Sequence, residues 1–368
     1  MTDFRFTRYL YEVDEVKIAL IIAILNNKPD AEFWAYELYH SGYSNELTLL
    51  FWELYYDFYA TLNPAFEKYL QTKLKNCSEN EKLVATIVNN FTIRPHNTDM
   101  FLLRNITTNS PTEFLFTKKT DYYSIAAAVL QEPYDEDKLT KTLEHFTSLG
   151  LKLNQPKIVT EFKKQSEFIR SNLLLMTLIM RCYSKLNKLK MGKNLYIQID
   201  MTEIEEYRTI LLKQPRKTLK SACLHSIDEH GYLSLFHLKR DDSDIVSAYR
   251  DGWLYAASFS PLWNSRIKQH NGSMNVETKE VVFETDDDTE EFYSQFGLEP
   301  DEQAIDVQHK SIGPIRHNET INWYSFYESH GLNCESRRLK NGLVQITREQ
   351  SERLNKLQYL THLKKATV

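Results

Sequence analysis

EFWAYELYHSGYSNELTLLFWELYYDFYATLNPAFEKY, residues Glu32–Tyr69, is the densest concentration of large aromatic side chains in this sequence. Apolar residues within it recur at steps of three and four, the spacing of one helix face, at Leu47, Phe51, Leu54, Phe58 and Leu62. Gly42 stands where a helix end favours a left-handed residue, and Ser44 or Asn45 can cap a following helix. The stretch therefore predicts two helices folded into a hairpin.

The rings of this stretch occur on more than one helix face, so further helices are expected to cover them. Core packing is one interpretation, and a groove that grips a partner protein is the other. The rings assigned to such a groove are Trp34, Tyr39, Trp52 and Tyr56. Base stacking is disfavoured because no lysine or arginine lies between Lys28 and Lys68.

Helical patterns continue on both sides of the aromatic stretch. They occupy Asp14–Asn26, Pro64–Leu74, Ser78–Val88, Tyr122–Leu130, Asp135–Leu149 and Val159–Leu189. Asn194–Asp200 alternates weakly and is expected to be a short strand. Residues 1–214 are therefore predicted to form a domain of stacked antiparallel helical hairpins.

Residues 215–368 have a mixed pattern and are expected to form a smaller α+β region, with its boundary near Pro215. Helices are predicted at Asp244–Tyr255, Pro261–Ile267 and Glu290–Phe296, with an amphipathic helix at Thr347–Lys365. Strand-like alternation occurs at Tyr232–Leu238 and Val276–Glu284. Trp253 and Trp263, with the segment Glu290–Gln303, are assigned to a second partner contact. The fold class is thus mainly α.

Composition limits the class of protein. The 368 residues contain only ten glycines and ten prolines, which argues against turn-rich β architectures. Four scattered cysteines form no C-x-x-C pair and suit free thiols in a reducing compartment. The first residues lack the apolar core of a signal peptide. The most apolar run, Leu173–Met180, is far shorter than the ~20 residues of a membrane span, so no membrane contact is expected.

Charge is distributed in blocks of alternating sign. Residues 138–193 contain twelve basic and three acidic residues, whereas residues 275–306 contain twelve acidic residues and one lysine. Residues 337–365 are again basic. Such blocks either pair within the chain or present a charged face to a partner.

The basic block is the candidate for nucleic-acid binding. The residues assigned to phosphate contacts are Lys163, Lys164, Arg170, Arg181, Lys185, Lys188 and Lys190. The alternative is a solvated helix face that balances the acidic block.

No linear catalytic motif occurs in the sequence, whether a phosphate-binding glycine loop, a G-x-S-x-G elbow or an H-E-x-x-H helix. The best metal candidate is the group Cys223, His225, His230 and His237, with Asp228 nearby, but its spacing matches no familiar zinc site. Asp286–Asp288 can bind a cation, yet acidic residues also stabilise a helix N-terminus. No metal or cofactor is predicted.

A resemblance to a known group of proteins is carried by three segments: FWAYELYHSGY (Phe33–Tyr43), WLYAASFSPLWNSRI (Trp253–Ile267) and EEFYSQFGLEPDEQ (Glu290–Gln303). They are similar to segments in uncharacterised helical proteins of large nucleocytoplasmic (giant) DNA viruses. The resemblance implies a virus-encoded protein of the host cytoplasm or the virion. It assigns no chemistry to any residue.

The leading hypothesis is a non-enzymatic α-helical scaffold or adaptor of a giant DNA virus that docks protein partners, with RNA as a second class of partner. By analogy with the helical middle domain of the translation-initiation scaffold, it would act in viral gene expression. The alternatives are a minor capsid or core component of the virion, and a metal-dependent, nuclease-like enzyme. The oligomeric state is left open.

Overall fold

A computed structural model describes residues 4–77, 80–97, 100–101, 136–163, 247–296 and 304–307, with isolated positions at 175, 177–178, 181–182, 192, 196–199 and 219. These residues are mainly helical and include one two-stranded antiparallel sheet, which confirms the predicted fold class. The proposed boundary near Pro215 and the predicted segments Tyr122–Leu130, Tyr232–Leu238 and Thr347–Lys365 lie outside them.

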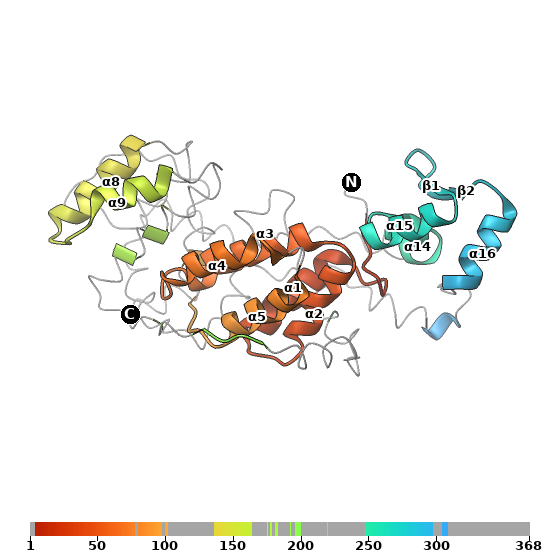
Figure 1. Cartoon of the computed structure of the whole chain (residues 1–368), viewed down its shortest axis with the longest axis horizontal. Coiled ribbons are helices and arrows are strands. Elements are labelled where there is room, and N and C mark those ends of the chain that lie inside the picture. Colours follow the sequence, from red (N-terminus) through yellow and green to blue (C-terminus); the bar gives the residue numbers. More distant parts are fainter. Residues whose placement is uncertain are drawn as a thin grey trace, which may run out of the picture.

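The most deeply buried element is helix α1 (Val13–Leu25). Nearly all its side chains are buried, including polar Glu15, because α1 is apolar around most of its circumference. The helices packed around it are α2 (Ala31–His40), α3 (Ser44–Leu54) and α5 (Glu81–Thr92), as Figure 1 shows. The first core is therefore built around α1.

The predicted hairpin of the aromatic stretch is confirmed. Helices α2 and α3 are joined by a turn in which Gly42 has a φ of +90°. Helix α3 then widens into a π-helix, η1 (Tyr55–Tyr59), which the sequence did not predict, and α4 (Phe66–Leu74) follows. Rings from these elements meet α5: Phe66 and Tyr59 both contact the ring of Phe91 edge-on.

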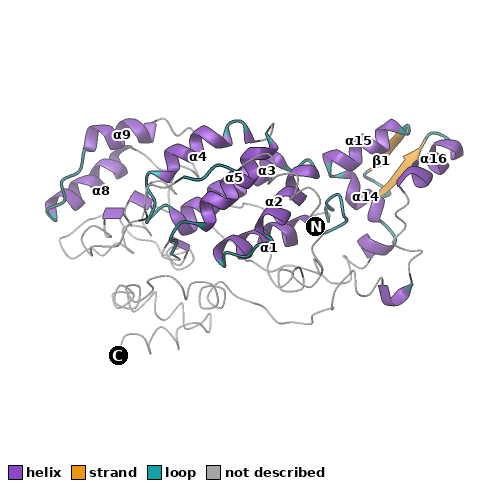
Figure 2. Cartoon of the chain, turned by 60° about the horizontal axis from the view of Figure 1, so that its bottom comes forward, coloured by secondary structure: helices purple, strands orange, loops and turns teal. Residues whose placement is uncertain are grey.

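Helices α8 (Glu136–Ser148) and α9 (Gln155–Lys163) form a second hairpin, at one end of the molecule in Figures 1 and 2. Gly150 follows α8 with a φ of +92°, as its place after the predicted helix indicated. Helix α9 begins before the predicted Val159 because the side chain of Asn154 accepts from the amide of Lys157 and caps it.

The predicted strand Asn194–Asp200 is wrong over its described residues, Tyr196–Ile199, which form no ladder. The side chain of Asn90 on α5 takes the place of a neighbouring strand. It donates to the carbonyl of Ile197 at 2.7 Å and accepts from the amide of Ile197 at 3.1 Å. Alternation alone does not reveal that a side chain satisfies this backbone.

A second core lies at the other end of the described chain. It contains α14 (Trp253–Ser258), α15 (Pro261–Gln269), β1 (Gly272–Asn275), β2 (Glu280–Phe283) and α16 (Asp286–Phe296). Two predictions are corrected here. The helix expected over Asp244–Tyr255 is interrupted at Asp251 and Gly252, and the strand expected at Val276–Glu284 is a loop followed by β2, which pairs with the earlier β1.

An N-terminal strap, residues Phe4–Glu12, joins the two cores. Phe6 and Leu10 belong to the second core, and the amide of Phe6 donates to the carbonyl of Ala256 at 3.1 Å. The indole Nε1 of Trp263 donates to the carbonyl of Thr7 at 3.3 Å. The second core is therefore completed by the first residues of the chain.

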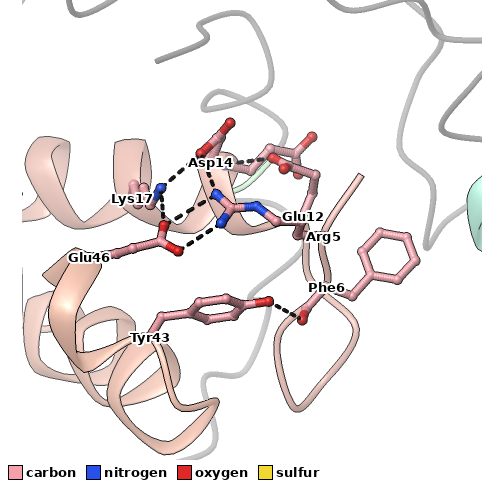
Figure 3. Close-up of polar contacts among 8 residues, drawn as sticks. Arg5, Phe6, Glu12, Asp14, Lys17, Tyr43 and Glu46 are labelled. Atoms are coloured by element: carbon pink, nitrogen blue, oxygen red, sulfur yellow. Dashed lines mark hydrogen bonds and ion pairs between the residues drawn. The ribbon is translucent and has the colours of Figure 1, made fainter. Parts of the chain in front are cut away.

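An ion-pair cluster fixes the strap to the first core (Figure 3). The Arg5 guanidinium lies 2.7 Å from the Glu46 carboxylate, and the Lys17 ammonium lies 2.6 Å from it. Burial alone would raise the pKa of Glu46, but Lys17 and Arg5 outweigh it and lower the pKa below its usual value. Tyr43 adds a hydrogen bond from its hydroxyl to the Phe6 carbonyl, at 3.2 Å.

Glu37, on α2, is fully buried beneath the strap. Its carboxylate accepts from the Arg8 guanidinium at 2.8 Å and from the amide of Tyr9 at 3.2 Å. Ser41, one turn later, accepts from the amide of Arg8 through its hydroxyl. A buried carboxylate without a cation is costly, so Glu37 requires the strap in place.

Gly42 permits the close approach of the two cores, because a Cβ there would lie 2.6 Å from the Cβ of Pro261. We expect Gly42→Ala to destabilise the protein by about 1 kcal/mol through its left-handed backbone, and by roughly 1–3 kcal/mol more through the clash with Pro261. Gly150→Ala is the matched control, since Gly150 shares the left-handed φ but has open space. Denaturant unfolding measures both, and equal losses would contradict the close approach.

Arg8→Met is expected to destabilise the protein by about 3 kcal/mol, because it leaves the Glu37 carboxylate buried without its cation. The double variant Arg8→Met/Glu37→Leu should regain most of that loss, since no charge is then buried. Arg250→Met, which removes an exposed ion pair with Asp251, should leave the unfolding midpoint nearly unchanged. A double variant as unstable as Arg8→Met would refute this account.

Candidate docking surface

The rings predicted to bind partners are mostly core residues. Trp34, Trp52, Tyr56, Trp253 and Trp263 are all buried, and Tyr39 is half-buried. A partner reaches a buried ring only if the core opens, so the five buried rings do not form a contact surface in this structure. The core-packing interpretation of the aromatic stretch fits these positions.

The two buried tryptophans of the second core hold the outer elements in place. The rings of Trp253 and Trp263 meet edge-on at 5.7 Å between centroids, and Phe296 of α16 lies 6.0 Å from Trp263. The guanidinium of Arg266 covers both Trp263 and Phe296, at 4.7 and 4.8 Å from the ring centroids. The hairpin and α16 are therefore mounted on a packed aromatic base.

The β1–β2 hairpin has an inner and an outer face. Val281 and Phe283 pack against the second core. The alternation of a strand places Val282 and Glu280 on the opposite face, where Val282 pairs with Ser273. The outer face of this two-stranded sheet is turned to solvent.

Apolar side chains remain exposed on and beside this outer face. Val276 in the hairpin loop is 61% exposed and Val282 is 50% exposed. The sequence did carry a signal for this, since the alternation of β2 makes one of its two consecutive valines face outward. Met274 pairs with Val281 on the inner face, where its Sδ accepts from the Ser258 hydroxyl at 3.0 Å.

Carboxylates surround these apolar side chains. The exposed ones are Glu277, Glu280, Glu284, Asp286, Asp287, Glu290 and Glu291, and the only lysine or arginine in residues 272–296 is Lys279. We name Val276 and Val282, with these carboxylates, the acidic hairpin face. It is the described part of the acidic block seen in the sequence.

Asp288, in the first turn of helix α16, bonds to the residue that caps the helix and is not an open ligand. Thr285 donates through its hydroxyl to the Asp288 carboxylate and accepts from the amide of Asp288 at 3.1 Å, which is a capping-box arrangement. Asn271 adds a bond at 2.8 Å. The hydrogen bonds from Thr285, then Asn271, lower the pKa of Asp288. The sequence before Glu290–Phe296 predicts Asp288 or Thr289 as the cap, whereas the N-cap residue in the structure is Thr285, three or four residues earlier.

In the described part of the chain, no three histidine, cysteine, aspartate or glutamate side chains converge as a metal site. The group Cys223, His225, His230 and His237 lies outside the described residues, so it remains a prediction.

The predicted phosphate-binding residues fall into two groups. Arg181 is a structural residue, because its guanidinium donates to the Tyr55 hydroxyl at 3.0 Å and to the carbonyl of Ala60 at 3.1 Å. Lys163 is exposed and pairs with Glu136 at 3.0 Å. Lys164, Arg170, Lys185, Lys188 and Lys190 lie outside the described residues.

Comparisons with protein-family models, with curated proteins and with solved structures find no match to this chain. Among the residues described, no helix is long and apolar enough to cross a membrane.

Thr285→Ala should raise the pKa of Asp288 towards 3.8, its ordinary value, because it removes the largest of the bonds to that carboxylate. A lowered carboxyl pKa stabilises the folded state above the unfolded pKa and loses that effect as the pH falls through the folded pKa. The stability difference between the variant and the natural protein should therefore shrink under acid. NMR titration of Asp288 measures the shift, and an unchanged pKa would exclude the cap; Thr278→Ala, in the exposed hairpin loop, is the control.

Proposed function

We propose that this chain is a non-enzymatic helical scaffold or adaptor of a giant DNA virus, acting in the host cytoplasm by docking protein partners. The observation that carries the proposal is the acidic hairpin face, a charged surface with exposed aliphatic side chains on a rigidly packed base. Viral origin rests on the resemblance of Phe33–Tyr43, Trp253–Ile267 and Glu290–Gln303 to proteins of that group.

The distribution of side chains supports a docking role. Aromatic residues, which provide much of the binding energy in many interfaces, are largely used up by the two cores. The acidic hairpin face, by contrast, gathers seven exposed carboxylates with a single lysine in residues 272–296. Charged patches of this kind guide association and choose partners by sign.

The sign of the face favours protein over nucleic acid as its partner. Phosphates are repelled by carboxylates, and nucleic-acid binding depends on lysine and arginine. Of the residues assigned to phosphate contacts, the described ones are Arg181, which is committed to the core, and Lys163, which pairs with Glu136. RNA therefore enters the proposal only as a partner of basic residues elsewhere in the chain.

Affinity purification from infected cells, with and without nuclease, tests the proposal. We expect identified protein partners to co-purify after nuclease treatment, and to be lost when Glu280 and Glu284 are both replaced by lysine. The matched control is Asp137→Lys/Glu144→Lys, which reverses two exposed charges on α8. Each partner is then purified and its direct binding measured.

Several results would overturn the proposal. Recovery of no partner, or equal loss of partners in both charge variants, would exclude the acidic hairpin face as the docking surface. Loss of every partner on nuclease treatment would assign the chain to RNA. Stoichiometric abundance in purified particles would indicate a virion component, and a stoichiometric metal ion in the purified protein would favour a metal-dependent enzyme.

A further inference from the structure

We infer that the occupant of the acidic hairpin face is a protein segment rich in lysine or arginine that also carries aliphatic side chains. This inference rests on the proposed docking function and specifies the partner's chemistry. Two features of the face carry it, namely its uniform charge and its exposed aliphatic residues.

The charge of the face defines the cationic part of the partner. Glu280 begins β2 and Glu284 follows it, and Asp286 and Asp287 lie in the first turn of α16, all of them exposed. Neutralisation within the face is minimal, since Lys279 is its only basic residue in residues 272–296. A partner with spaced lysines or arginines places a cation near several carboxylates at once and relieves their mutual repulsion.

The apolar residues define the aliphatic part. Val282 points away from the second core, in the middle of the outer face, and Val276 lies in the adjoining loop. A chain of lysines alone would leave both valines in contact with water, because an ammonium group is strongly hydrated. Aliphatic side chains on the partner would cover the valines and gain the free energy of apolar burial.

The mounting of the face makes this recognition selective. Its outer residues belong to a hairpin whose inner side chains, Val281 and Phe283, pack against the second core, with the Phe283 ring 5.0 Å from that of Phe292. Little ordering is then needed when a segment binds, and a preorganised surface loses less free energy on association.

Fluorescence anisotropy on the full chain tests the inference with four labelled probes. They are a peptide alternating lysine and valine, a peptide alternating lysine and serine, a peptide alternating glutamate and valine, and a single-stranded RNA. We expect the lysine–valine peptide to bind most tightly, with affinity falling as salt is added. Glu280→Lys/Glu284→Lys should weaken it by about tenfold, and Asp137→Lys/Glu144→Lys should not.

A third variant separates the aliphatic contribution from charge. Val276→Ser/Val282→Thr keeps the charge and the β-branched residue of the strand, and should reduce binding of lysine–valine to the level of lysine–serine. Equal binding of the two lysine peptides to the natural protein would refute the aliphatic part. Binding of RNA or of the glutamate peptide in preference, or no binding of any probe, would overturn the inference. If the peptides fail while a co-purifying protein still depends on Glu280 and Glu284, the docking function stands and only the partner's chemistry is wrong.

Discussion

The structure depends on a junction at the end of α2, where one turn of backbone makes the hydrogen bonds that connect the two cores. The carbonyl of Ser41, at the end of α2, accepts from the hydroxyl of Ser260 and from the amide of Leu262 at 3.4 Å. The hydroxyl of Ser41 accepts from the strap at Arg8. A single residue thus connects α2, the N-terminal strap and α15. Because Glu37 lies buried one turn earlier, the strap, the helical body and the second core are energetically linked.

This junction explains why the described surface of the second core is charged and not aromatic. The strap gives Phe6 and Leu10 to the second core, and Trp263 turns its ring inward to reach the carbonyl of Thr7. The two tryptophans therefore lie inside the second core, and the β1–β2 hairpin and α16 pack around them on the outside. The outer layer contains mostly residues that water solvates well, with Val276 and Val282 as the exceptions.

Helical periodicity predicted the fold class, the α2–α3 hairpin and the left-handed Gly42, because these features are local. The role of the aromatic rings could not be predicted in the same way. The spacing of Trp34 and Trp52 fits both a core and a groove, and only the packing of the surrounding helices distinguishes the two. Asn90 bonding to the backbone of Ile197, across more than a hundred residues, leaves no local pattern. The hydrogen bond from Arg181 to Tyr55 is similarly distant in sequence, so the sequence did not reveal it and predicted that Arg181 binds phosphate.

The acidic hairpin face shows how far composition carries a functional argument. The sequence identified the block of negative charge but left open whether it pairs within the chain or faces a partner. Among the described residues, the structure places Glu280, Glu284, Asp286 and Asp287 on an outer surface, while the inner face of β2 is used for packing. Alternation along β2 thus places Val281 and Phe283 against the second core, and Glu280 and Val282 on the face proposed for docking. Substitutions on the outer face should therefore have little effect on the fold, which lets the proposed docking role be tested separately from stability, whereas substitutions on the inner face would disrupt the packing that supports the outer face.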